Sequence, residues 1–129
     1  MDARALRTKI QAVHRLRTAV LEEALAIGPI LSGSLFKRYR VCGKPRCRCA
    51  RGKKHGPYWC LSVFRAGTPR VFPLTSSAVV RARVAARAYR RWRTRVRRLR
   101  ALDAALQGLL ERLRLVDQLD PAEVIRKRP

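Results

Sequence analysis

Residues that bind metal ions are concentrated in one short stretch of this chain. The segment from Tyr39 to Cys60 contains all four cysteines and one of the two histidines. Three of the cysteines and the histidine follow one another with the spacing C-x4-C-x-C-x5-H: Cys42, Cys47, Cys49 and His55. Three thiolates and one imidazole form a ligand set that suits tetrahedral zinc, and four protein ligands leave no position for a catalytic water. The pattern therefore predicts a structural zinc site.

Cys60 is the competing fourth ligand of this site. It lies in a run of alternating apolar residues, where a buried free thiol is ordinary, so we choose His55 instead. Without a metal the cysteines would be reduced thiols, and a Cys–His nucleophilic pair is the enzymatic alternative. The closeness of three thiols within eight residues favours metal over both alternatives. In a reducing compartment it also favours metal over disulfides.

Basic residues greatly outnumber acidic ones. The 129 residues include 31 Lys and Arg against 8 Asp and Glu, which gives a formal net charge of +23. No carboxylate lies between Ala24 and Leu102, a stretch that contains 21 basic residues. A chain of this kind repels itself unless a polyanion is bound. We therefore predict a nucleic acid partner, DNA or RNA, and an anionic membrane surface is the rival partner.

The sequence shows no segment that would insert into a membrane. No stretch approaches the roughly 20 apolar residues that a membrane span needs. The first ten residues, MDARALRTKI, contain no apolar signal core. We therefore expect a cytoplasmic protein with no membrane partner.

Two groups of basic residues are the candidate contacts to phosphate. Arginine forks bind phosphate through two hydrogen bonds at once, whereas a merely solvated helix face normally mixes both signs of charge. The first group surrounds the cysteines: Lys44, Arg46, Arg48, Arg51, Lys53 and Lys54. The second group lies on a long predicted helix: Arg83, Arg87, Arg90, Arg91, Arg95 and Arg98. Tyr58 and Trp59 are either core residues or platforms on which an unpaired base stacks.

The elements that position these residues can be predicted from hydrophobic periodicity. Apolar residues at steps of three and four predict an amphipathic helix over 3–28, which Gly28-Pro29 ends. Alternation predicts strands over 34–41, 58–64 and 70–74, with Pro73 on an edge strand. These strands form a three-stranded antiparallel meander over 34–74, in which the metal-binding loop 42–55 joins the first two strands.

A second and longer helix is predicted over 76–118. Thr75 and the two serines that follow it offer N-caps, and the apolar residues again recur at steps of three and four. This helix can pair antiparallel with the first, and residues 119–129 form a mobile basic tail. The sequence thus predicts one α+β domain over 1–129, with two long antiparallel helices, a small three-stranded antiparallel sheet and a zinc-knuckle loop.

Several short motifs resemble an uncharacterised family of small bacterial proteins that is described only as a domain of unknown function. They are GSL at 33–35, CGKPRCRCARG at 42–52, HGPY at 55–58 and LS at 61–62. The resemblance covers about residues 33–110, including the hairpin and the long Arg-rich helix. It implies the same three cysteines and histidine, and an aromatic residue is commoner at the position of Cys60, which supports His55 as the ligand. It also implies an occurrence beside mobile-element genes, but no established activity.

These observations predict a non-catalytic, zinc-binding protein that binds nucleic acid through phosphate contacts. We expect it to serve as an accessory subunit of a mobile-element or other nucleoprotein machine, in complex with a larger protein. One alternative is a nuclease or recombinase, but metal-dependent nucleases need clustered carboxylates, and residues 24–102 contain none. The other alternative is a helical protein–protein scaffold, which an unpaired apolar seam along 102–116 would favour.

Overall fold

The computed structural model describes residues 1–126, and these divide into two compact units. The first, which we call the helical unit, combines Met1–Ala26 with the chain from Arg93 onward; the second, the sheet unit, is Ile27–Trp92. The long helix α2, Ser76–Asp117, contributes residues to both units. Helices and a three-stranded antiparallel sheet are both present, so the predicted α+β class is confirmed.

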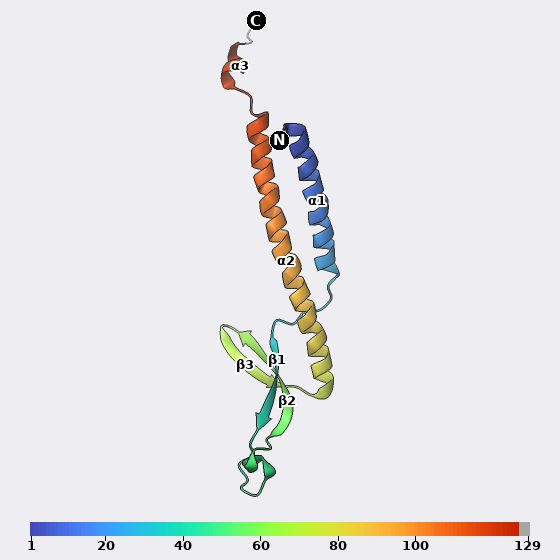
Figure 1. Ribbon diagram of the computed structural model, residues 1–129, viewed down its shortest axis with the longest axis vertical. Helices are drawn as coiled ribbons and strands as arrows, with labels where there is room; N and C mark the ends of the chain where they lie inside the picture. The colour runs from blue at the N-terminus through green and yellow to red at the C-terminus, as the bar shows by residue number, and fades with distance from the viewer. Residues whose placement is uncertain (127–129) are drawn as a thin grey trace. The chain divides into compact units, whose positions relative to one another are not determined.

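In the helical unit, α1 (Ala3–Ala26) runs antiparallel to the later turns of α2 (Figure 1). Three ion pairs join the two helices, and the residue number on α2 falls as the number on α1 rises. The pairs are Arg7 with Asp117, Arg17 with Asp103, and Glu23 with Arg95. This order is possible only between antiparallel helices, so the predicted pairing is confirmed.

Apolar side chains between these ion pairs form the small core of the helical unit. Leu6 is the most deeply buried large side chain of the described structure, and Leu109 of α2 is also buried. Asp2 caps α1, because its carboxylate accepts a hydrogen bond from the backbone N–H of Ala5 at 2.7 Å. The helix ends at Ala26, two residues before the predicted end and just before Gly28-Pro29.

The sheet unit contains the three strands in the order β1-β2-β3, all antiparallel, as the sequence predicts. They are β1 (Ser34–Arg40), β2 (His55–Arg65) and β3 (Thr68–Pro73). The turn between β2 and β3 is Ala66-Gly67, and both residues have positive φ, at 50° and 77°. Two such residues match the twist of a tight hairpin, which fixes the β2–β3 register.

The first turns of α2 lie against one face of this sheet. The backbone N–H of Leu31 donates to the carbonyl of Ala85 at 3.0 Å, which ties the segment before β1 to the helix. The guanidinium of Arg83 lies 5.0 Å from the ring centroid of Trp59 in β2. Adjacent residues of a strand point to opposite faces. Trp59 therefore faces α2, and Tyr58 faces the other side.

The end of the described chain differs from the predicted mobile tail at 119–129. Pro121–Arg126 forms a short helix, α3, and residues 127–129 of that predicted tail lie outside the described residues. Asp120 begins the helix by accepting a hydrogen bond from the N–H of Ala122 at 2.9 Å. Within residues 1–126, no helix is both long and apolar enough to cross a bilayer.

Candidate metal centre

The four predicted ligands come together at one end of the β1–β2 pair. One ligand atom from each residue lies within 4.8 Å of the ligand atoms of the other three: Cys42, Cys47, Cys49 and His55. Cys42 Sγ is 3.4 Å from Cys49 Sγ, and Cys47 Sγ is 3.1 Å from His55 Nε2. The sequence-predicted set is therefore positioned to bind a metal ion.

The cysteine loop, residues 41–54, contains three of these ligands. Hydrogen bonds between residues that are close in sequence hold the loop. Cys47 immediately precedes the single 3₁₀ turn η1 (Arg48–Arg51), and Cys49 lies within it. Gly52 ends that turn with a φ of 102°, which a residue with a side chain rarely adopts, and its N–H donates to the carbonyl of Cys49 at 3.3 Å. The backbone N–H of Cys42 donates to Cys49 Sγ at 3.4 Å, so backbone and sulfur are already paired within the site.

The fourth ligand is held by the sheet. The sequence placed His55 in the loop, but it is the first residue of β2 and pairs with Arg40 of β1. The register of the β1–β2 pair shifts between Arg38 and Arg40, so that Arg38 pairs with Tyr58 and Arg40 pairs with His55. Gly56 adopts a φ of 124°, and a Cβ there would lie only 2.8 Å from the carbonyl oxygen of Arg38. Glycine at this position allows the two strands to approach closely beside the ligand.

The donor set fits a tetrahedral metal. A Zn–S bond of about 2.3 Å and a tetrahedral angle imply ligand-to-ligand distances of about 3.8 Å. The observed distances of 3.1 and 3.4 Å, with 4.8 Å as the upper limit, bracket that value. Cys49 is buried, Cys47 and His55 are half-buried and Cys42 is exposed, so the site lies at the surface of the unit.

Cys60 lies outside the cluster. It is buried in β2, opposite Phe36 of β1 and Pro73 of β3, and its Sγ is 3.9 Å from the carbonyl of Tyr58. The choice of His55 over Cys60 in the sequence analysis therefore agrees with the geometry. Cys60 is an apolar packing residue of the sheet.

The charges divide unequally between the two units. Of the 31 Lys and Arg residues, 16 lie in the sheet unit, whereas all 8 Asp and Glu residues lie in the helical unit. The six predicted cations of the cysteine loop are all exposed around the metal ligands. No acidic side chain of the sheet unit offsets them, so this unit has a strongly positive surface.

The predicted arginines of α2 separate into two kinds. Arg87, Arg90, Arg91 and Arg98 are exposed. Arg83 instead lies over the Trp59 ring, and Arg95 Nε is 2.6 Å from the Glu23 carboxylate, within the helical unit. Arg83 and Arg95 therefore have structural partners that the sequence analysis did not foresee.

The sequence analysis did not include two further cations of the sheet among the candidate phosphate contacts. Arg38 and Arg40 are exposed and, with Tyr58, line a cavity of about 200 Å³. The alternation of β1 could have indicated them, since residues two apart on a strand share a face. The structure thus adds a positively charged face beside the metal site.

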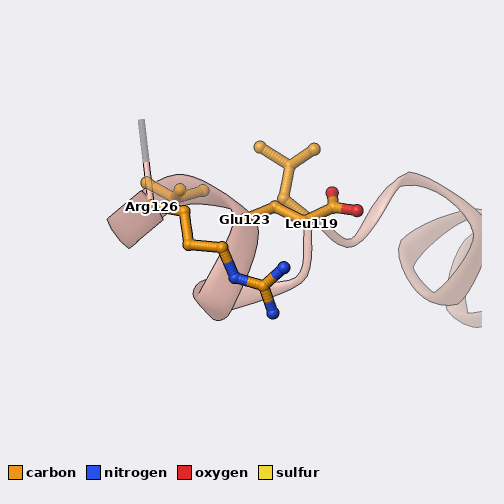
Figure 2. A pocket seen from close by; sticks show the side chains of 4 residues that line it. Leu119, Glu123 and Arg126 are labelled. Atoms are coloured by element: carbon orange, nitrogen blue, oxygen red, sulfur yellow. The ribbon is translucent and has the colours of Figure 1, made fainter. Parts of the chain in front are cut away.

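A separate pocket lies next to α3 in the helical unit (Figure 2). The described residues that line it are Leu119, Glu123, Val124 and Arg126. Glu123 is the one carboxylate among them, and Arg126 lines the same pocket. A metal-dependent nuclease needs several carboxylates together, so these four residues do not resemble such a site.

Comparison with known proteins finds a similarity that includes the metal cluster. A family model for a domain of unknown function, DUF6788, matches residues 7–70. The match includes most of α1, all four candidate ligands and part of β3, so it begins earlier and ends earlier than the span of about 33–110 expected from the motifs. No curated protein and no solved structure matches the chain. Residues 7–70 of this chain are thus similar to the DUF6788 family of domains of unknown function.

Proposed function

We propose that this protein binds nucleic acid through phosphate contacts, carries out no covalent chemistry, and uses zinc as a structural ion. The observation that carries the proposal is the composition of the sheet unit. This unit has 16 cations, no carboxylate and a Cys3His cluster at its cysteine loop. A surface of one sign attracts a polyanion and releases its condensed counterions on binding. The partner we propose is therefore DNA or RNA.

Zinc is the ion that we assign to the cluster. Thiolate and imidazole together favour zinc over magnesium or calcium, which prefer oxygen ligands. Within the cysteine loop only Cys49 is buried, so the loop has almost no hydrophobic core of its own. Zinc held by the four ligands would fix the loop and leave no open coordination position. The four free thiols of the described chain suit a reducing compartment such as the cytoplasm.

A fixed loop explains how the basic residues would bind phosphate. Ordering long cationic side chains on binding costs conformational entropy, and a loop already held in one conformation reduces that cost. The loop cations are distributed on both sides of η1, so an extended phosphate backbone can contact several of them. Phosphate contacts carry no base information. We therefore expect binding with little sequence preference, as suits an accessory subunit of a mobile-element or other nucleoprotein machine.

The scaffold alternative finds less support in the helical unit. Of the predicted apolar seam along 102–116, Leu109 is buried and Leu102, Leu106 and Leu113 are half-buried. These side chains are largely covered within the unit. The exposed large apolar side chains of this stretch are Leu110, Leu115 and Val116.

The proposal is tested by measuring how binding depends on salt. The affinity for a labelled oligonucleotide would be measured by fluorescence anisotropy across a range of salt concentrations. The test variant replaces three exposed loop cations, Lys44, Arg51 and Lys53, with glutamine. Each lost phosphate contact reduces the slope of log affinity against log salt by about 0.7 to 0.9. The variant should therefore lose about 2 to 3 units of slope.

A matched control removes the same charge from the helical unit. The variant with Arg4, Lys9 and Arg15 replaced by glutamine changes three exposed cations of α1. It should change the slope by less than about one unit, because these residues do not contact phosphate in the proposed complex. Equal effects of the two variants, or no salt-dependent binding by the wild type, would contradict the proposal. Elemental analysis of the same preparations should find one zinc per chain, and a value near zero would exclude zinc as the bound ion.

A further inference from the structure

The two faces of the small sheet have different surroundings. On the face towards α2, two cations contact the ring of Trp59: Arg83 lies 5.0 Å from the ring centroid and Lys37 lies 5.3 Å from it. The Trp59 ring is therefore already occupied by contacts within the unit. Of the two adjacent aromatic residues that sequence analysis offered as stacking platforms, the structure leaves only Tyr58 with an available ring.

The opposite face, which we call the open face, carries exposed aromatic and basic side chains. Tyr58 is 47% exposed, and Phe64 of β2 and Val71 of β3 are also exposed. The strand register places these residues on the same face as Phe36, Arg38 and Cys60. The guanidinium of Arg38 lies 5.9 Å from the Phe36 ring centroid, within the range of a cation–π contact.

A cavity in this face combines the features that an unpaired nucleotide needs. It has a volume of about 200 Å³, and its lining residues are Arg38, Arg40, Tyr58, Trp59, Cys60, Val71, Pro73 and Leu74. Tyr58 offers a flat ring, the two arginines offer guanidinium forks, and the other lining residues are largely apolar. The sheet unit contains no carboxylate that would repel a phosphate. An acidic peptide would satisfy the arginines, but it would leave the exposed Tyr58 and Phe64 rings without planar partners.

We propose that the open face binds single-stranded nucleic acid by stacking an unpaired base on Tyr58, while Arg38 and Arg40 bind the adjacent phosphates. This inference rests on the proposed function and adds the class of nucleic acid. Bases of a duplex are stacked on one another and are not available to a protein ring, whereas every unpaired base has a free face. The protein therefore prefers single strands to duplexes.

The course of the chain supports a continuous path for such a strand. Arg40 ends β1 and pairs with His55, so the open face meets the metal cluster at this point. The exposed cations of the cysteine loop begin four residues later, at Lys44. A single strand that leaves the Tyr58 ring can thus follow Arg38 and Arg40 into the basic loop, where the proposed phosphate contacts lie.

The test compares substitutions at Tyr58 on single-stranded and duplex probes. The probes are oligouridylate, oligodeoxythymidylate and a mixed-sequence DNA duplex, each of about 20 nucleotides or base pairs, longer than one binding site of this kind. Stacking on one ring contributes enough that Tyr58→Ala should weaken single-strand binding about 5-fold to 100-fold. The duplex affinity should stay unchanged. Tyr58→Phe keeps the ring and should bind single strands as the wild type does.

Tyr39 provides a matched control. It has the same side chain, is 53% exposed and lies on the neighbouring strand, but it does not line the cavity. Tyr39→Ala should leave both affinities unchanged, and zinc content should be one per chain in every variant. Tighter binding to either single strand, RNA or DNA, supports the inference and identifies the preferred sugar.

Two results would overturn the inference. If Tyr58→Ala binds single strands as tightly as the wild type, the ring carries no base. If it weakens duplex and single-strand binding equally, the residue does not act by stacking on unpaired bases. In both cases salt-dependent binding by the wild type would leave the proposed function in place. Absence of salt-dependent binding to all three probes would overturn the inference and the proposed function together.

Discussion

The assignment of the metal ligands predicts opposite results for two cysteines that are equally buried. Cys49 and Cys60 are each 3% exposed, and both lie in the sheet unit. Serine in place of either one exchanges a buried thiol for a hydroxyl of similar size. Cys49 belongs to the cluster and Cys60 does not, so this pair of variants separates loss of a ligand from loss of packing.

The expected magnitudes differ clearly. Structural zinc binds with about 10 to 16 kcal/mol in small zinc domains, which is about 2.5 to 4 kcal/mol for each of four ligands. Cys49→Ser should therefore weaken zinc binding by about 100-fold to 1,000-fold. Cys60→Ser should keep the wild-type zinc affinity and lower the free energy of unfolding by about 1 to 3 kcal/mol, because it buries a hydroxyl in a site that suits an apolar thiol.

The assay is competition with a coloured zinc chelator, combined with urea unfolding of the zinc-loaded proteins. Unchanged zinc affinity in Cys49→Ser would show that this thiol is not a ligand. Equal losses of zinc affinity in the two variants would show that the site depends on sheet packing rather than on direct coordination. Either result would refute the four-ligand assignment.

Three further predictions concern the helices and the absence of catalysis. Leu6→Ala should cost about 2 to 5 kcal/mol in urea unfolding, because Leu6 is 1% exposed, whereas Leu25→Ala should change stability by less than about 0.5 kcal/mol, because Leu25 is 77% exposed; similar costs would mean that α1 packs through another face. Arg95→Gln should lower the melting temperature slightly by removing the ion pair with Glu23, and it should leave the salt slope of binding unchanged, whereas Arg98→Gln should reduce that slope by about 0.7 to 0.9; the reverse pattern would assign phosphate binding to Arg95. Purified protein incubated with labelled DNA and RNA in magnesium or manganese should leave both intact on a gel, and specific cleavage would contradict a non-catalytic role.

Local patterns were sufficient to predict the two long helices, the three strands and the candidate metal ligands. The periodicity of α1 and α2 at steps of three and four is a property of residues close in sequence, and so is the helix end at Gly28-Pro29. Both can therefore be recognised without knowledge of the fold. The same holds for the ligands, because Cys42, Cys47 and Cys49 lie close together in the chain. Proximity in sequence made their proximity in space a safe prediction.

Contacts between distant segments were not predictable in the same way. The partner of Arg95 depends on the register between α1 and α2, which short-range periodicity does not determine. Strand alternation predicts that Tyr58 and Trp59 face opposite sides, but it does not say which side α2 will cover. The start of β2 at His55 was also missed, because glycine and proline at 56 and 57 indicate a turn more strongly than a strand.

The division of acidic residues between the two units has a consequence for how the protein responds to ionic strength. Mobile ions at about 0.1 M screen charges over roughly 10 Å. In the helical unit such screening weakens the exposed ion pairs that link α1 to α2. In the sheet unit it relieves repulsion among cations that have no acidic neighbour in the same unit. Added salt should thus lower the stability of the helical unit and raise the stability of the sheet unit. In the sheet unit, dissolved anions would partly replace the stabilising effect that the proposed nucleic acid partner would have.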